Sequence, residues 1–185
     1  MNTKPFEKSC PERHQIRLTG YDYTRQGACF VTICTQDKHC LFGNIVDSTM
    51  KLNPFGEIAE SVWKGIPLHY PEVNNEVFIV MPNHVHGIIL VHDPGREVSN
   101  SAPAKKHPLS EVVRAFKTYS SRKINELRKS PGTPVWQRSY YEHVIRDESD
   151  YHQIGEYILY NPAKWEMDRE NPYPLETVKP LPFEY

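Results

Sequence analysis

The order of apolar segments along the chain constrains its fold more than any other feature. Four segments are rich in β-branched and aromatic residues, as strands are: 27–35, 75–81, 84–92 and 135–145. Two segments with apolar residues every three to four positions, starting near Asn53 and Pro108, are typical of amphipathic helices. The order is therefore strand, helix, strand, strand, helix, strand. It predicts an α+β fold with a ferredoxin-like, split βαβ antiparallel sheet and helices on one face.

A further helix is predicted after the last strand. It opens between Asp147 and Asp150, contains Ile154 and Ile158, and ends near Pro162. This helix is additional to the six-element pattern, so we expect it to be appended to the sheet.

The length of 185 residues fits one domain, which we place at 1–185 with a core at about 17–165 and irregular tails. The segment 93–107 is polar and rich in proline and glycine, and is predicted to be an exposed loop. No window approaches the roughly 18 apolar residues of a membrane helix, and no signal peptide is recognisable, so the sequence predicts a soluble, cytoplasmic protein without a membrane partner.

Two histidines flank a valine at the start of the predicted strand 84–92. Alternate side chains of a strand face the same way, so His84 and His86 are expected to point to one spot. Two convergent imidazoles suit a divalent metal ion. The tripeptide alone is more often a pair of surface or hydrogen-bonded histidines that bind no metal, and a divalent transition metal and a magnesium-like ion are both open.

The appended helix carries a second polar pair. Tyr157 and Asn161 are four residues apart and lie on one helical face. A tyrosine hydroxyl can attack a phosphate, and an asparagine can ligate a metal or orient a substrate. The alternative is a half-buried aromatic residue followed by a helix stop before Pro162.

The second predicted helix is basic on one side. Between Lys105 and Lys129 there are eight lysines and arginines against two glutamates. Such residues can neutralise phosphates, and nearby aromatic side chains can stack on unpaired bases. The predicted DNA contacts are Arg114, Lys117, Arg122, Lys123, Trp136 and Arg138. A solvated helix face is the alternative, and the net charge of −1 excludes only a protein that coats nucleic acid non-specifically.

Several short strings together resemble REP-associated tyrosine transposases, which belong to the HUH single-strand DNA endonucleases. They are Tyr21 to Tyr23 (YDY), Phe30 to Ile33 (FVTI), Met81 to Gly87 (MPNHVHG), Trp136 to Arg138 (WQR), Tyr141 to Arg146 (YEHVIR), and Tyr157-Ile158 followed by Asn161-Pro162. The strings occur in order from about Arg17 to Trp165. The combination of HVH with the later tyrosine string is far more specific than either alone.

The resemblance implies a ferredoxin-like core and a set of roles. His84 and His86 would bind Mg or Mn, Asn161 would be the third ligand, and Tyr157 would form a 5′-phosphotyrosine and release a 3′-hydroxyl. The implied substrate is single-stranded DNA that contains hairpins or palindromic repeats. Tyr160 lies about 300° around the helix from Tyr157, which favours Tyr157 as the nucleophile.

Two other functions remain compatible with the sequence. One is a hydrolase of another substrate, with zinc held by His84, His86 and His92. The other is a regulator that binds hairpin DNA without cutting it. The sequence leaves open a homodimer, in which Tyr157 would act in its own subunit or in the partner.

Overall fold

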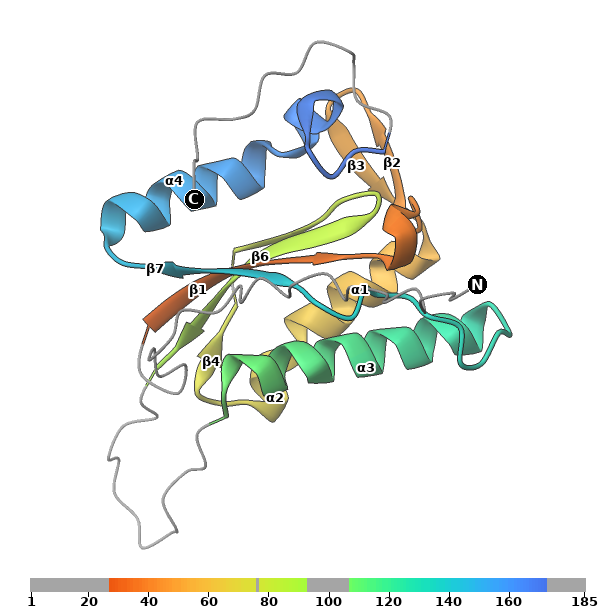
Figure 1. Ribbon diagram of the computed structural model, residues 1–185, viewed down its shortest axis with the longest axis horizontal. Coiled ribbons are helices and arrows are strands. Elements are labelled where there is room, and N and C mark those ends of the chain that lie inside the picture. The colour runs from red at the N-terminus through yellow and green to blue at the C-terminus, as the bar shows by residue number, and fades with distance from the viewer. Residues whose placement is uncertain (1–26, 76, 93–106, 173–185) are drawn as a thin grey trace, which may run out of the picture.

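An antiparallel sheet forms the centre of the computed structural model, which describes residues 27–75, 77–92 and 107–172. The spatial order of its strands is β4-β6-β1-β7, and β5 also pairs with β6. The bounds are β1 (Gly27–Cys34), β4 (Val73–Asn74), β5 (Phe78–Val80), β6 (His84–Val91) and β7 (Tyr141–Ile145). The two long strands β1 and β6 lie side by side, as the split βαβ order requires (Figure 1).

Helices cover both faces of this sheet (Figure 1). Three lie on one face: α1 (Pro54–Lys64), α2 (Ile66–His69) and α3 (Leu109–Leu127). The appended α4 (Glu148–Tyr160) lies on the opposite face and is followed by the 3-10 helix η2 (Pro162–Met167). The predicted fold class, a ferredoxin-like antiparallel sheet with an appended C-terminal helix, is confirmed.

Local signals explain where the helices begin. The side chain of Asn53 accepts hydrogen bonds from the backbone N–H groups of Phe55 and Gly56, and Pro54 occupies the first turn of α1. Asp147 caps α4 in the same way, by accepting from the N–H of Asp150. Both starts agree with the sequence prediction.

Alternation along the strands separates two cores. The odd-numbered residues of β1 and β6, such as Val31 and Ile89, pack against the α1 and α3 side. The even-numbered Phe30 and Ile88 pack against Ile154 and Ile158 of α4. Each strand therefore contributes to two different environments.

Trp63 of α1 is the largest fully buried side chain of the first core. Its ring is fully buried, stacks on Phe78 at 4.4 Å between centroids, and meets Phe116 edge-on. Gly87 of β6 provides the space, because a Cβ at this position would lie 2.4 Å from Cζ2 of Trp63. The glycine of the HVHG string is thus required by packing on the face away from the histidines.

The structure corrects three details of the predicted elements. The strand predicted at 75–81 consists of β5 alone, and the strand predicted at 135–145 pairs regularly only from Tyr141. A hairpin of β2 (Gly43–Val46) and β3 (Thr49–Leu52) was missed. Its two-residue turn holds Asp47 and Ser48 at positive φ without a glycine, so the usual sequence signal is absent.

Other predictions fall outside the described residues: the YDY string, most of the 93–107 loop and the tail after residue 172. Among the described residues, no helix combines the length and the apolar character needed to cross a membrane.

Candidate metal and nucleophile site

The two histidines of β6 meet at one point beneath α4. His84 and His86 are 0% and 2% exposed, and their Nε2 atoms are 2.9 Å apart. The Nδ1 atom of His84 lies 2.8 Å from Oδ1 of Asn83, and that of His86 lies 2.9 Å from Oγ1 of Thr32. Thr32 is the cross-strand partner of His86 on β1. Because both Nδ1 atoms have partners, the two rings are oriented with Nε2 inward.

Burial keeps both imidazoles neutral. It lowers the pKa of His84 to about 3, with a smaller contribution from the charge of Lys38. Burial also lowers the pKa of His86 well below its usual value, and His84 adds to this effect, against the opposing influence of Asp168 and Glu170. A neutral imidazole is the form that ligates a metal ion.

The spacing of the two nitrogens fits a shared cation. Two ligands about 2.1 Å from one ion, at right angles to each other, are about 3 Å apart. The observed separation of the Nε2 atoms is 2.9 Å. The pair can therefore occupy two adjacent positions of an octahedral ion with little adjustment.

Tyr157 reaches this point from α4. Its hydroxyl oxygen is 3.4 Å from Nε2 of His86, and the two rings are 5.2 Å apart. Phe30 packs edge-on against Tyr157 and also contacts the ring of His86. The predicted nucleophile and the two predicted histidine ligands thus lie together, although 71 residues separate Tyr157 from His86 in the chain.

A third histidine, on β7, ties the start of α4 to the sheet. Nε2 of His143 on β7 lies 3.1 Å from Oδ2 of Asp150, whose carboxylate also accepts from the backbone N–H of Arg146. Further along, Ile154 and Ile158 pack on the sheet. These contacts fix the rotation of the helix that carries Tyr157.

Asn161 ends α4 one turn after Tyr157. Its side chain is buried, with the residue 2% exposed, and its Oδ1 has no hydrogen-bond partner among the described residues. A buried amide oxygen without a partner is costly, and a bound cation would satisfy it. The chemistry of the donor set therefore fits a metal ion.

Asp168 is a candidate ligand that the sequence did not reveal. It follows η2, is 5% exposed, and offers a carboxylate oxygen within 4.8 Å of nitrogens of His84 and His86. Carboxylate and imidazole are both common metal ligands. The run around Asp168 has no motif spacing relative to the histidines, so only the tertiary structure identifies it.

Neighbouring contacts hold the segment that carries Asp168. Nδ2 of Asn83 donates to the backbone oxygen of Glu170 at 2.7 Å. The Glu170 carboxylate pairs with Lys38 at 3.0 Å and accepts from the thiol of Cys34. The ring of Trp165 lies 6.0 Å from that of His84. The two histidines are therefore enclosed by residues after α4.

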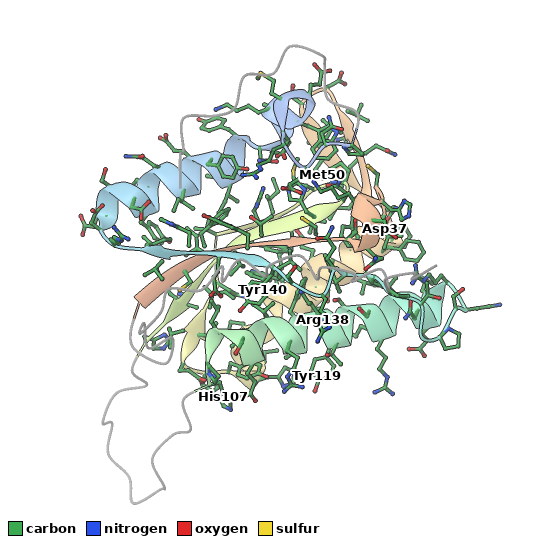
Figure 2. All side chains as sticks on the ribbon, viewed as in Figure 1. Asp37, Met50, His107, Tyr119, Arg138 and Tyr140 are labelled. Atoms are coloured by element: carbon green, nitrogen blue, oxygen red, sulfur yellow. The ribbon has the colours of Figure 1, made fainter. Side chains whose placement is uncertain are left out.

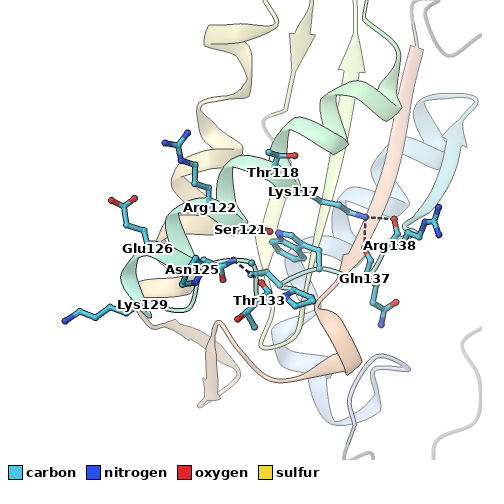
Figure 3. A pocket seen from close by; sticks show the side chains of 15 residues that line it. Lys117, Thr118, Ser121, Arg122, Asn125, Glu126, Lys129, Thr133, Gln137 and Arg138 are labelled. Atoms are coloured by element: carbon cyan, nitrogen blue, oxygen red, sulfur yellow. Dashed lines mark hydrogen bonds between the residues drawn. The ribbon is translucent and has the colours of Figure 1, made fainter.

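The predicted DNA contacts lie on the other side of the sheet. Arg114, Arg122 and Lys123 are exposed on α3, and Arg138 is exposed after it. An open groove of about 1010 Å³ runs between α3 and the segment 131–138, and Lys117, Arg122, Trp136 and Arg138 all line it (Figure 3). The structure groups these four residues together but away from His84, His86 and Tyr157.

Two of the six predicted DNA contacts, Trp136 and Lys117, make contacts inside the protein. Trp136 is only 7% exposed, packs against Phe42 and Phe116, and donates from Nε1 to Oγ of Ser120. It has no free ring face for a base. The ammonium of Lys117 is surrounded by backbone carbonyls. The assignment of all six residues as DNA contacts stays a prediction.

His92, the suggested third zinc ligand, cannot join this site. It follows the far end of β6 and is exposed. Six residues of strand separate it from His86, a distance of about 20 Å. A third ligand must come from another element.

The ferredoxin-like sheet brings a buried histidine pair and a helical tyrosine together in this chain. No family model matches the chain. A Haemophilus influenzae protein of uncharacterized function is 40% identical over 182 residues, which span 91% of this chain and 98% of its own length. A second protein from the same organism carries the name of a REP-associated tyrosine transposase. It is 30% identical over 144 residues, spanning 77% of this chain and 74% of its own length.

The chain belongs to the REP-associated tyrosine transposases. A solved structure of a REP-associated tyrosine transposase bound to a REP hairpin has the same fold, with a TM-score of 0.55 and 18% identity. The match covers 78% of this chain and 72% of that one. The resemblance inferred from the sequence is confirmed.

Proposed function

We propose that this protein cuts and rejoins single-stranded DNA through a covalent 5′-phosphotyrosine at Tyr157. The observation that carries the proposal is the position of the Tyr157 hydroxyl, 3.4 Å from Nε2 of His86 and beside the paired Nε2 atoms. A nucleophile and a candidate cation site in contact are what phosphoryl transfer requires.

The covalent step is a transesterification that exchanges one phosphoester bond for another and needs no ATP. The oxygen of Tyr157 forms a bond to phosphorus, and the bond from phosphorus to the 3′-oxygen breaks. The phenol proton is matched by the proton gained by the released 3′-hydroxyl. Reversal by a 3′-hydroxyl restores the phosphodiester, because the bond energy is retained in the phosphotyrosine.

His84 and His86 would hold Mg or Mn, with Asn161 and Asp168 as candidate further ligands. When bound, such an ion would withdraw charge from the scissile phosphate. The protein's own groups orient the reaction: Thr32 and Asn83 hold the imidazoles, and Phe30 supports the ring of Tyr157.

The burial of the site has a consequence for DNA entry. With His84 and His86 at 0% and 2% exposure, a phosphate can reach them only after neighbouring side chains move. Trp165 and Asp168 approach the pair from the segment after α4. We propose that this segment shifts when DNA binds.

The proposed substrate is DNA that folds into a hairpin. The supporting observations are the fold shared with a REP-associated transposase bound to a REP hairpin, and the basic groove along α3. Neutralisation of phosphates by these residues would supply affinity, while the unpaired strand beside the hairpin would reach Tyr157.

A covalent adduct assay tests the proposal. Labelled single-stranded DNA with an imperfect palindrome from the flanking genome is incubated with the protein in Mn or EDTA, and SDS-resistant adducts are separated on a gel. We expect an adduct that needs metal and is lost in Tyr157→Phe. Tyr160→Phe is the matched control, because Tyr160 is 60% exposed on the same helix. Binding without any adduct would instead support the non-cutting regulator.

A zinc hydrolase is the second candidate, favoured by the grouping of His84, His86 and Asp168. Two histidines and one carboxylate form a common catalytic zinc set. In that case Asp168→Asn would abolish activity, whereas Tyr157→Phe would spare it. The two functions therefore give opposite results for Tyr157→Phe, which would abolish adduct formation by the nuclease and spare the activity of the hydrolase.

A further inference from the structure

The segment before β7 contains an irregular stretch along the edge of β1. Thr32 pairs with Tyr141, and Thr35 pairs with Trp136. Between these two pairs the β1 side has two residues, 33 and 34. The segment that precedes β7, here called the edge segment, has four residues between the same pairs, 137–140. The edge segment therefore bulges by two residues. A bulge withdraws backbone groups from the sheet ladder and redirects side chains.

Lys117 of α3 supplies the hydrogen bonds that this bulge needs. Its Nζ lies 3.0 Å from the carbonyl oxygen of Gln137, 3.4 Å from that of Arg138 and 2.9 Å from that of Ser139. The same ammonium is 5.3 Å from the ring centroid of Tyr140. An ammonium has three donors, which matches three consecutive carbonyls. Figure 3 shows the hydrogen bonds to Gln137 and Arg138.

The start of the bulge is held separately. Nε1 of Trp136 donates to Oγ of Ser120, which lies one helical turn after Lys117 on α3. The backbone N–H of Gln137 donates to the carbonyl of Cys34 at 2.9 Å. Regular pairing resumes at Tyr141. Lys117 is thus the contact from α3 that fixes the middle of the bulge.

The bulge determines where Arg138 points. Arg138 is exposed and lines the groove beside α3, and Figure 2 places it and Tyr140 on the α3 side of the sheet. An arginine on an unsupported four-residue loop would sample many directions, and ordering it on binding would cost affinity. A fixed backbone removes part of that cost.

We infer that Lys117 is a positioning residue for DNA recognition, which holds the bulge so that Arg138 meets a phosphate, and that Lys117 does not itself contact DNA. The inference rests on the proposed function, because it assumes that the groove binds DNA. It differs from the sequence prediction, in which Lys117 was one of the phosphate contacts.

The salt dependence of binding separates a positioning role from a direct contact. Affinity for the hairpin oligonucleotide is measured for wild type, Lys117→Met and Arg138→Met over a range of salt concentrations. Each lost phosphate contact lowers the slope of log affinity against log salt by about 0.7–0.9. We expect that decrease for Arg138→Met. For Lys117→Met we expect about tenfold weaker binding with an unchanged slope.

Hydrogen exchange of the free protein tests the positioning role without DNA. In Lys117→Met the amides of residues 137–140 should exchange at least about tenfold faster, while those of β1 and β6 stay protected and report that the fold is intact. This arm remains informative if the wild type fails to bind or cut DNA, so failure of the proposed function can be distinguished.

The inference would be overturned by unchanged exchange at 137–140 in Lys117→Met. A slope for Lys117→Met that falls as much as for Arg138→Met would also overturn it, since Lys117 would then be a phosphate contact. So would faster exchange without any loss of DNA affinity, because the bulge would then have no role in recognition.

Discussion

The two faces of the sheet differ sharply in what they contain. Among the described residues, the α1 and α3 face has a core of twenty buried apolar residues, whereas the α4 face has a core of five. The α4 face also contains buried polar residues: Thr32, His84, His86 and Asn161. Because buried apolar area drives folding, stability must come mainly from the first face, which leaves the second free to hold a polar site.

The contrast is clearest between two neighbours in β6. His86 points toward α4 and contacts Tyr157, whereas Gly87 points the other way and leaves room for Trp63. Substitutions at these positions should therefore affect different properties.

His86→Ala should abolish formation of the covalent DNA adduct while the protein stays folded. Loss of an imidazole that faces Tyr157 and the candidate metal is expected to slow adduct formation on the order of 10⁴-fold, equivalent to about 5.4 kcal/mol in the barrier. The melting temperature measured by circular dichroism should fall by only a few degrees. A variant that still forms adducts at the wild-type rate would show that the histidine pair has no part in the reaction.

Trp63→Ala should have the opposite outcome, a large loss of stability. Its fully buried ring contacts both Phe78 and Phe116, so truncation should cost roughly 3–5 kcal/mol of unfolding free energy. Urea unfolding gives this value, and Trp165→Ala on the other face is the matched control. Equal losses for the two tryptophans would contradict the division between the faces.

Gly87→Ala should lower the free energy of unfolding by less than Trp63→Ala does. The added methyl would lie 2.4 Å from Cζ2 of Trp63, so the indole must shift, at a cost of about 1–3 kcal/mol. The rate of adduct formation should stay near wild type in the folded protein. Combining it with Trp63→Ala provides the control, because most of the penalty should disappear once the indole is gone, leaving only the contact of the added methyl with Cδ2 of Phe78 at 3.1 Å.

Glu72→Gln should have the smallest effect, limited to acid pH. Burial raises the pKa of the Glu72 carboxyl, but hydrogen bonds from its own backbone and from His107 outweigh this and leave the pKa below its usual value. A lowered folded-state pKa gives stability that is complete above the unfolded pKa and lost as pH falls through the folded value. Melting temperatures of wild type and variant should therefore converge between about pH 5 and pH 3. A constant difference would exclude this titration.

The fold was largely predictable because its signals are local. The β-branched runs that form β1 and β6, the Asn53 cap and the apolar stripe of α3 each specify an element within a few turns of chain. The β2–β3 hairpin was missed since Asp47 and Ser48 lack the glycine that marks such turns. The sequence predicts regular strand at 137–140, and the bulge found there depends on Lys117, twenty residues before Gln137, which local pattern does not reveal.

The periods of local structure place His84 and His86 on one face of a strand, and Tyr157 and Asn161 on one face of a helix, so the sequence is enough to predict both pairs. The meeting of these two faces, the approach of Asp168, and the internal contacts of Trp136 and Lys117 become visible only in the folded chain. Such contacts between distant segments depend on how helices pack on the sheet, which no local period encodes.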